Sequence, residues 1–138
     1  MEKVEVNAEH RYSVLIGCNW REELSRIVSE RTRVAIVFSS AMRSRLGVID
    51  APDAELHLME IPDGEAGKRI KVLDSLWTQL ADAGFTRSDL LVAIGGGATT
   101  DIAGFAAATW LRGIDWVAIP TTLSGMVDAA IGGKTGLN

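Results

Sequence analysis

Three consecutive glycines, Gly95-Gly96-Gly97, follow the apolar run 90–94 and precede a stretch of small residues that contains Asp101. A strand that ends in glycines and leads into a helix exposes backbone N–H groups, and the helix N-terminus favours negative charge. A carboxylate such as Asp101 can accept hydrogen bonds from two ribose hydroxyls. These residues favour a site for the pyrophosphate and ribose of a nucleotide. The structural alternative is a turn used only for close packing, with Asp101 complementing the helix N-terminus.

Two other polar segments follow apolar runs in the same way. Asp63-Gly64-Glu65-Ala66-Gly67-Lys68 comes after the run that ends at Ile61, and Pro120-Thr121-Thr122 comes after the run that ends at Ile119. Glu65 offers a second carboxylate for ribose, and the threonine hydroxyls fit further cofactor contacts. Capping of the next helix is the alternative role for either threonine. Three such segments favour a nucleotide-sized site over three separate packing turns.

The order of apolar runs and helical patterns indicates how these segments are positioned. Continuous apolar runs predict buried strands, whereas apolar residues at a spacing of three or four predict helices. Strands are predicted at 12–16, 34–38, 56–61, 90–94 and 115–119, and helices after Asn19, over 41–46, over 70–84, after the glycines and after Pro120. The alternation predicts an α/β fold of the Rossmann-like, doubly wound class, with a mostly parallel sheet and helices on both faces. Because ligands bind at the carboxyl ends of such strands, the three polar segments are expected at one edge.

Two short motifs do not match the patterns that they resemble. The dinucleotide fingerprint requires glycine at its first, third and sixth positions, but Gly95 and Gly97 are followed by Thr100. Gly133-Lys134-Thr135 resembles the end of a P-loop, yet Asp128 stands where that loop requires its first glycine. The sequence therefore argues against the usual dinucleotide fingerprint and against a P-loop nucleoside triphosphatase.

Composition and charge exclude several classes of protein. The 138 residues are 47% hydrophobic and 23% charged, which is typical of one globular domain over 1–138. The net charge of −4 has interspersed signs and leaves no basic face for nucleic acid. No apolar run reaches the roughly 18 residues of a membrane span, and the charged N-terminus has no signal-peptide pattern. Cys18 is the single cysteine, so a reduced, cytoplasmic setting is expected.

Beyond these separate motifs, the second half of the chain closely resembles the 3-dehydroquinate synthases, sugar-phosphate cyclases of the shikimate pathway that leads to chorismate and the aromatic amino acids. The resemblance covers 61–138 and is carried by 62–65 with Lys68, 95–105, 108–113, 120–123, 126–128 and 132–136. Before Ile61 only the layout of elements is similar. All three polar segments therefore fall within the resemblance.

In that family an N-terminal α/β domain holds NAD, and a helical C-terminal domain supplies a divalent metal site, zinc or cobalt, and much of the substrate pocket. The resemblance implies that this chain is the NAD-binding domain of a longer two-domain enzyme, without the helical metal domain. The glutamate and two histidines that bind metal in the family have no counterparts here, since His10 and His57 do not match them. No metal ligand is therefore expected in this chain.

The resemblance also assigns residues to the cofactor and to the substrate. It implies NAD contacts from Asp63, Gly64, Glu65, Ala66, Gly67, Lys68, Gly96, Gly97, Ala98, Thr99, Thr100, Asp101, Thr121, Thr122 and Lys134. It implies substrate contacts from Arg112, Asp128 and Lys134. In the family the matching arginine reaches the neighbouring subunit's site, which implies a homodimer; the alternatives are a helix-end role for Arg112 and a solvated loop position for Lys134. One departure is Ser39-Ser40, which stands where the family often has an aspartate for the adenosine ribose.

The implied activity is that of a lyase, which converts 3-deoxy-D-arabino-heptulosonate 7-phosphate to 3-dehydroquinate and phosphate with NAD as a transient oxidant. The 138-residue chain alone is expected to bind NAD weakly and to be inactive, and no catalytic residue is assigned to it. Three alternatives remain: a cyclase that makes other cyclitols, a metal-dependent polyol dehydrogenase, and a non-catalytic NAD-binding module. The dehydrogenases usually have a lysine soon after the matching aspartate, where 103–105 is Ala-Gly-Phe here.

Overall fold

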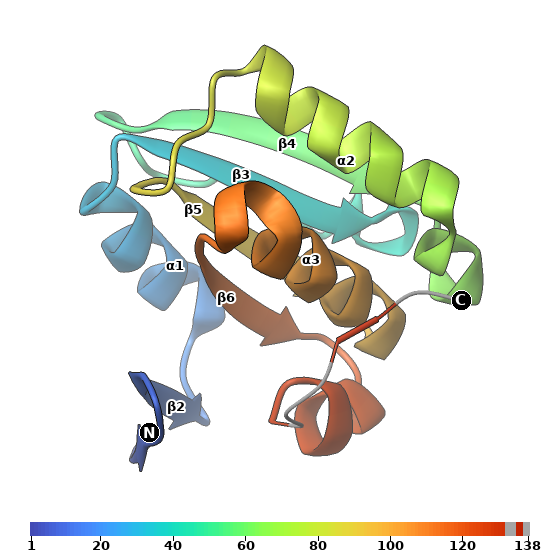
Figure 1. The fold of residues 1–138 in the computed structure, drawn as a ribbon. Helices are drawn as coiled ribbons and strands as arrows, with labels where there is room; N and C mark the ends of the chain where they lie inside the picture. The colour runs from blue at the N-terminus through green and yellow to red at the C-terminus, as the bar shows by residue number, and fades with distance from the viewer. Residues whose placement is uncertain (132–134, 137–138) are drawn as a thin grey trace.

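The computed structural model describes residues 1–131 and 135–136, and Figure 1 shows how they are arranged. The strands are β1 (Glu2–Asn7), β2 (Arg11–Ile16), β3 (Arg33–Ser39), β4 (Glu55–Ile61), β5 (Leu90–Gly95) and β6 (Asp115–Pro120). The α-helices are α1 (Trp20–Ser29), α2 (Ile70–Asp82) and α3 (Gly97–Thr109). Short helical turns are η1 (Ser40–Met42), η2 (Gly64–Lys68), η3 (Trp110–Arg112) and η4 (Gly125–Ala129).

Four strands form one parallel sheet in the order β4-β3-β5-β6. Every residue of β5 is buried, as is almost all of β3, and such continuous apolar runs are typical of strands covered on both faces. The chain passes from β3 to β4 and then returns beyond β3 to β5, so the strand order reverses between β3 and β5. In doubly wound sheets ligands bind at the carboxyl end of this reversal.

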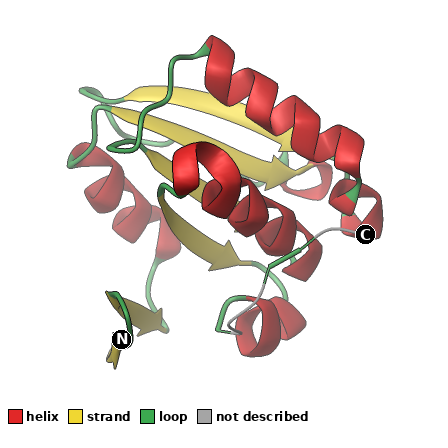
Figure 2. Ribbon diagram, in the orientation of Figure 1, coloured by secondary structure: helices red, strands yellow, loops and turns green. Residues whose placement is uncertain are grey.

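Different segments cover the two faces of the sheet (Figures 1 and 2). On one face α2 and α3 share a core with the strands, through fully buried residues that include Leu76 and Ile102. On the other face α1 packs with the irregular segment between β3 and β4, through buried Leu24, Met42 and Leu46. Right-handed crossovers explain this division, because connections that run in opposite directions must lie on opposite faces. The predicted α/β class, with helices on both faces, is confirmed.

Local signals in the sequence explain where two of the helices begin and end. Oδ1 of Asn19 accepts a hydrogen bond from the Arg21 N–H group at 3.2 Å, and its amide donates to Glu22 at 3.0 Å, so Asn19 caps α1. Gly84 follows α2 with φ of +71°, a left-handed conformation that glycine adopts without strain. The sequence predicted both of these helix ends correctly.

Two elements differ from what the sequence predicts. The strand predicted at 12–16 is present as β2, but it pairs with β1 in an antiparallel hairpin and is not part of the parallel sheet. A short apolar run such as 14–16 fits an antiparallel hairpin as well as a parallel sheet, so the sequence carried no information about its partner. The helix predicted over 41–46 is reduced to η1, because the chain turns at Gly47, where φ is +68°.

Candidate nucleotide-binding site

The three polar segments predicted to lie at one edge of the sheet do so. η2 follows β4, the glycine turn (residues 95–97) joins β5 to α3, and Thr121 and Thr122 follow β6. Because the four strands are parallel, all three segments lie at the carboxyl edge of the sheet. η2 and η4 both pack against α3, so segments far apart in the sequence meet around this helix. The fold therefore gathers most of the predicted cofactor residues near the start of α3.

The glycine turn is packed so closely that a side chain does not fit at one of its positions and would be tight at another. A Cβ atom at Gly95 would lie 2.6 Å from Oγ1 of Thr99, and one at Gly96 would lie 3.3 Å from Cγ2 of Thr122. At Gly97 a Cβ atom would make only an ordinary contact. Close packing therefore explains why position 95 is a glycine. Packing does not explain the glycine at position 97.

At the start of α3, backbone N–H groups have no hydrogen-bond partner among the described residues. Gly96 is the residue before the helix and offers no side-chain cap. The first hydrogen bond within α3 runs from the Thr100 N–H group to the Gly96 carbonyl, at 3.1 Å. The N–H groups of residues 97–99 therefore have no partner within the helix, and the helix dipole adds partial positive charge there. This arrangement suits an anion such as a pyrophosphate.

An ion pair connects α3 to η2. Nζ of Lys68 lies 3.2 Å from Oδ2 of Asp101 and 3.7 Å from Oε2 of Glu65. The Lys68 and Asp101 side chains are only 17% and 26% exposed. Asp101 stands in the second turn of α3, so its charge is used in this pair and not in capping the helix. Among the residues described, Oδ1 of Asp101 has no hydrogen-bond partner, which leaves it for a ligand hydroxyl.

The two threonines after β6 have different roles. The Thr121 N–H group donates to the Gly95 carbonyl at 2.8 Å and so holds the end of β6 beside the glycine turn. Oγ1 of Thr122 accepts from the Gly125 N–H group at 3.0 Å, as a helix cap does. The structural alternative therefore applies to Thr122, while the side chain of Thr121 has no hydrogen-bond partner in the described part of the chain.

The other predicted cofactor residues differ in how exposed they are. In η2 and just before it, Asp63, Gly64, Glu65 and Ala66 are exposed, whereas Gly67 is buried. In α3, Ala98 is half-buried, and Thr99 and Thr100 are buried. The Thr100 hydroxyl donates back to the carbonyl of the glycine turn at 3.0 Å, so it is already paired. Cofactor contacts by these residues stay a prediction.

The predicted substrate residues are not brought together with the rest. Arg112 follows α3 at the opposite edge of the sheet, because a helix of 13 residues carries the chain about 20 Å from the glycine turn. Arg112 is exposed and has φ of +68°, an uncommon conformation for a residue with a side chain. Asp128 is exposed on η4, which packs against α3. Lys134, also predicted to contact NAD, lies outside the described residues.

Sequence reasoning missed an ion pair at the same edge of the sheet. Arg43 follows η1, and its Nε and Nη2 atoms lie 2.6 and 2.5 Å from the two carboxylate oxygens of Glu60 near the end of β4. Hydrogen bonding to Glu60 raises the pKa of Arg43, and the same bonds lower the pKa of Glu60. The only available signal was charge, since an arginine and a glutamate 17 residues apart have no spacing rule.

The lowered pKa of Glu60 predicts a loss of stability in acid. A carboxyl group whose pKa is lower in the folded protein than in the unfolded chain stabilises the fold above its ordinary value of 4.5, and this contribution is lost as the pH falls. We expect the free energy of unfolding to decrease as the pH is lowered below about 4.5. In Glu60→Gln this decrease should be less steep. Urea unfolding between about pH 3 and 7 measures both slopes. Equal slopes for Glu60→Gln and the parent chain, with Glu9→Gln as the exposed control, would contradict the assignment.

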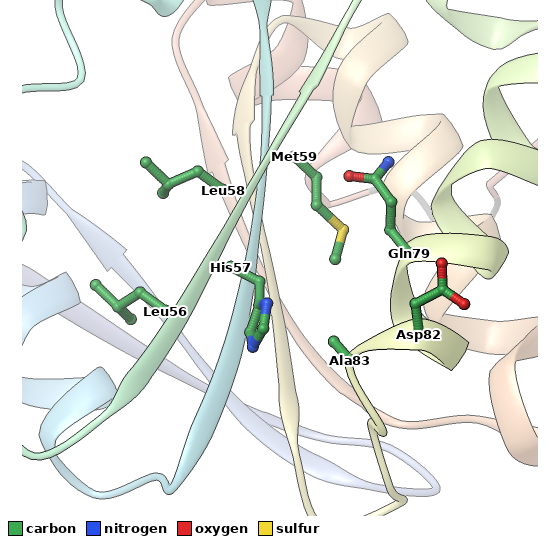
Figure 3. Close-up of a pocket in the computed structure, with 7 residues that line it drawn as sticks. All are labelled: Leu56, His57, Leu58, Met59, Gln79, Asp82 and Ala83. Carbon is green, nitrogen blue, oxygen red and sulfur yellow. The ribbon is translucent and has the colours of Figure 1, made fainter.

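Two surface hollows lie away from this edge. One lies between β4 and α2 and is lined by Leu56, His57, Leu58, Met59, Gln79, Asp82 and Ala83. Figure 3 shows His57 and Met59 on the α2 side of β4, with Leu56 and Leu58 on the other side. The second hollow is lined by Trp77, Thr109, Trp110 and Leu111. Neither set contains a residue predicted to bind cofactor or substrate.

The remaining features concern His57, metal-binding side chains and membrane spans. Nε2 of His57 lies 2.8 Å from Oε1 of Glu55 on the same strand, so His57 has a carboxylate partner within its own chain. Within residues 1–131 and 135–136, no three side chains of the metal-binding types gather into a site. In the same residues no helix has both the length and the apolar character needed to cross a membrane.

The open parallel sheet, the reversal of strand order and the glycine turn at the carboxyl edge define a Rossmann-like, doubly wound α/β domain. The model of the family described as 3-dehydroquinate synthase N-terminal matches residues 58–138, which is more than half of the chain. The chain belongs to this family, so the resemblance found in its sequence is confirmed.

Similar proteins agree with this assignment. The 3-dehydroquinate synthase of Mycobacterium leprae is 48% identical over 98% of this chain and 38% of that protein. The 3-dehydroquinate synthase of Leifsonia xyli is 51% identical over 92% of this chain and 36% of that protein. Among solved structures, the 2-epi-5-epi-valiolone synthase of Streptomyces hygroscopicus, with NAD+ and Zn2+ bound, is 34% identical with a TM-score of 0.82, over 98% of this chain and 39% of that one. The chain thus spans about two fifths of the length of the relatives that it matches.

Proposed function

We propose that this chain is the cofactor-binding part of a 3-dehydroquinate synthase. The complete enzyme is a lyase that converts 3-deoxy-D-arabino-heptulosonate 7-phosphate to 3-dehydroquinate and phosphate. One observation carries the proposal: in a chain of this family, a glycine turn with free backbone donors is tied to η2 by the Lys68–Asp101 ion pair. The biosynthetic reaction and the composition fit a cytoplasmic enzyme.

The residues at the carboxyl edge fit NAD. Packing does not account for the glycine at position 97, and the N–H groups of residues 97–99 lie at the helix end that favours a phosphate. Oδ1 of Asp101 is available to accept a hydrogen bond from a ribose hydroxyl. Asp63, just before η2, and Glu65, within it, are exposed carboxylates. When bound, NAD supplies a hydride acceptor. The residues of this chain hold and orient it.

The rest of the reaction needs groups that this chain does not supply. We infer that a metal ion, zinc or cobalt, is bound by the further part of the enzyme, because the similar valiolone synthase has Zn2+ bound. Asp128 and Lys134 would face the substrate. Arg112 lies at the far edge of the sheet, which suits a residue that serves a partner subunit's site and supports a homodimer.

A second candidate function is supported by one specific finding. The valiolone synthase, a sugar-phosphate cyclase of different product, is 34% identical to this chain at a TM-score of 0.82. The cofactor-binding part therefore fits more than one cyclase. The much higher identity to the 3-dehydroquinate synthases, 48% in the Mycobacterium leprae protein, favours that reaction.

A chimera tests the proposed reaction. The chimera is the Mycobacterium leprae 3-dehydroquinate synthase in which the matching 38% of the protein is replaced by this chain. We expect the chimera to release phosphate from 3-deoxy-D-arabino-heptulosonate 7-phosphate in the presence of NAD+, and the 138-residue chain alone to bind NAD+ in a calorimetric titration without releasing phosphate. A folded chimera without phosphate release, or phosphate release by the chain alone, would contradict this division of roles.

A further inference from the structure

The turn that follows α3 has a backbone conformation that its residues do not favour. Leu111 has φ of +47° and ψ of +40°, and Arg112 has φ of +68°, so two consecutive residues with side chains are in the left-handed region. This region is uncommon for residues other than glycine, because the Cβ atom comes too close to the following carbonyl oxygen. Such conformations persist only where the surrounding structure holds them. The contacts around η3 therefore have to hold Arg112 in place.

Backbone hydrogen bonds tie both ends of this turn to α3. At its start, the Trp110 N–H group donates to the Ala106 carbonyl. At its end, the Gly113 N–H group donates to the Trp110 carbonyl at 2.8 Å, and the Ile114 N–H group donates to the Ala107 carbonyl at 3.0 Å. The Ile114 side chain is buried in the core that the sheet shares with α2 and α3. The path of the backbone through the turn is therefore fixed on both sides.

A side chain from α2 reaches the residue before the turn. Nε1 of Trp77 donates to Oγ1 of Thr109, the last residue of α3, at 3.1 Å. The Thr109 hydroxyl in turn donates to the Phe105 carbonyl at 2.7 Å. The Trp77 ring packs against the core, which leaves it little freedom to move. Trp77 therefore anchors the end of α3, from which η3 begins.

The turn has a second feature that stability does not explain. Nε1 of Trp110 is buried and has no hydrogen-bond partner among the described residues, although buried donors are usually paired. The side chains of Leu111 and Arg112 are exposed. An unfavoured backbone and an unpaired donor in one short turn are features that cluster at functional sites.

The exposed end of the turn is a guanidinium. A guanidinium can bind two oxygens of a phosphate through parallel hydrogen bonds, but only when its planar group is presented in the right direction. Ordering a long side chain on a freely moving loop would reduce the affinity. The fixed backbone at Arg112 therefore favours binding of a phosphate group outside this domain.

We propose that Trp77 is a positioning residue for the reaction: its hydrogen bond to Thr109 holds η3 in the conformation that presents Arg112 to the substrate phosphate in a partner subunit's site. This inference rests on the proposed function, because that function gives Arg112 its substrate. Trp77 itself contacts neither the substrate nor the cofactor. Its effect on the reaction must therefore pass through Arg112.

Steady-state kinetics of the Mycobacterium leprae chimera test the proposal. Arg112→Gln is expected to raise KM for 3-deoxy-D-arabino-heptulosonate 7-phosphate by about tenfold or more, because a charged hydrogen bond to the phosphate is lost. Trp77→Phe keeps an aromatic ring but removes the N–H donor, and should raise KM about three- to tenfold at nearly unchanged kcat. Thr109→Val should have the same effect as Trp77→Phe, whereas Thr109→Ser keeps the hydroxyl and should retain the KM of the parent chimera.

A double-mutant cycle separates positioning from packing. In the Arg112→Gln background, Trp77→Phe should raise KM no further, because its effect passes through Arg112. Trp20→Phe changes a partly buried tryptophan on the other face of the sheet, and as the matched control it should leave KM unchanged.

The outcomes distinguish the inference from the proposed function. Additive increases in KM, or a parent-like KM in Trp77→Phe beside a raised KM in Arg112→Gln, would overturn the inference and leave the proposed function in place. A parent-like KM in Arg112→Gln would show that the substrate role proposed for Arg112 is wrong, and the inference would fail with it.

The 138-residue chain gives a measurement that does not depend on activity. The Gly113 N–H group closes the turn, so its hydrogen exchange should be about three- to tenfold faster in Trp77→Phe and unchanged in Trp20→Phe. Parent-like exchange at Gly113 in Trp77→Phe would show that Trp77 does not hold the turn, and this result would overturn the inference even if the chimera released no phosphate.

Discussion

Asp101→Asn is expected to weaken NAD+ binding to the chain by about 10- to 100-fold, because hydrogen bonds to a charged acceptor are worth about 1.5–3 kcal/mol and every 1.4 kcal/mol is tenfold. The carboxylate has two tasks. Oδ2 pairs with Lys68 at 3.2 Å, and Oδ1 is available for a ribose hydroxyl. An asparagine keeps the shape of the side chain but removes the charge on which both contacts depend. Titration calorimetry with NAD+ measures the loss.

The thermal midpoint separates a binding role from a structural one. Asp74→Asn changes an exposed acid on α2 and serves as the control, with no expected effect on either affinity or midpoint. In Asp101→Asn the midpoint should also fall, because the Lys68–Asp101 ion pair is partly buried. A large fall in the midpoint with unchanged affinity for NAD+ would show that Asp101 only holds η2 against α3.

Gly67→Ala is expected to reduce the free energy of unfolding by about 1–3 kcal/mol, the usual cost of overpacking. A Cβ atom at Gly67 would lie 2.5 Å from the carbonyl oxygen of Pro62, and this backbone atom cannot rotate away as a side chain could. η2 would have to move, and Lys68 would move with it. Because domains of this kind are stable by only about 5–15 kcal/mol, urea unfolding detects the change readily.

A matched glycine provides the control for this prediction. At Gly136 a Cβ atom would have nothing within 4 Å, so Gly136→Ala should leave the free energy of unfolding within about 0.5 kcal/mol of the parent chain. The displaced η2 in Gly67→Ala should also weaken NAD+ binding, because the Lys68–Asp101 distance would increase. Parent-like stability in Gly67→Ala would mean that the turn before η2 adjusts without cost.

The sequence predicted those parts of the fold that depend on the pattern of a single strand or a single turn. β3 and β5 are short, continuous apolar runs, a pattern typical of strands covered on both faces. The carboxyl-edge position of the glycine turn then follows from the parallel order. The place of β2 did not follow, since its short apolar run fits an antiparallel hairpin as well as a sheet edge.

The site was predictable only in part, because its strongest contacts join distant positions. Lys68 and Asp101 are 33 residues apart, and each was a cofactor candidate, but nothing in their spacing indicates that they pair with each other. The sequence allowed either capping or cofactor binding for Thr122. In the structure its hydroxyl accepts a hydrogen bond from the Gly125 N–H group, as a cap does. Such pairs depend on how loops from different strands meet, which composition and periodicity do not determine.

The two faces of the sheet differ in a way that bears on how this family can change. On one face the glycine turn begins α3, a 13-residue helix whose inner residues are fully buried, so most substitutions there disturb the core. The crossover from β3 to β4, on the other face, has no α-helix and only η1. Loops of this kind tolerate substitution and insertion. Mutations can therefore change the loop after β3 with little effect on the core, whereas substitutions in α3 disturb it.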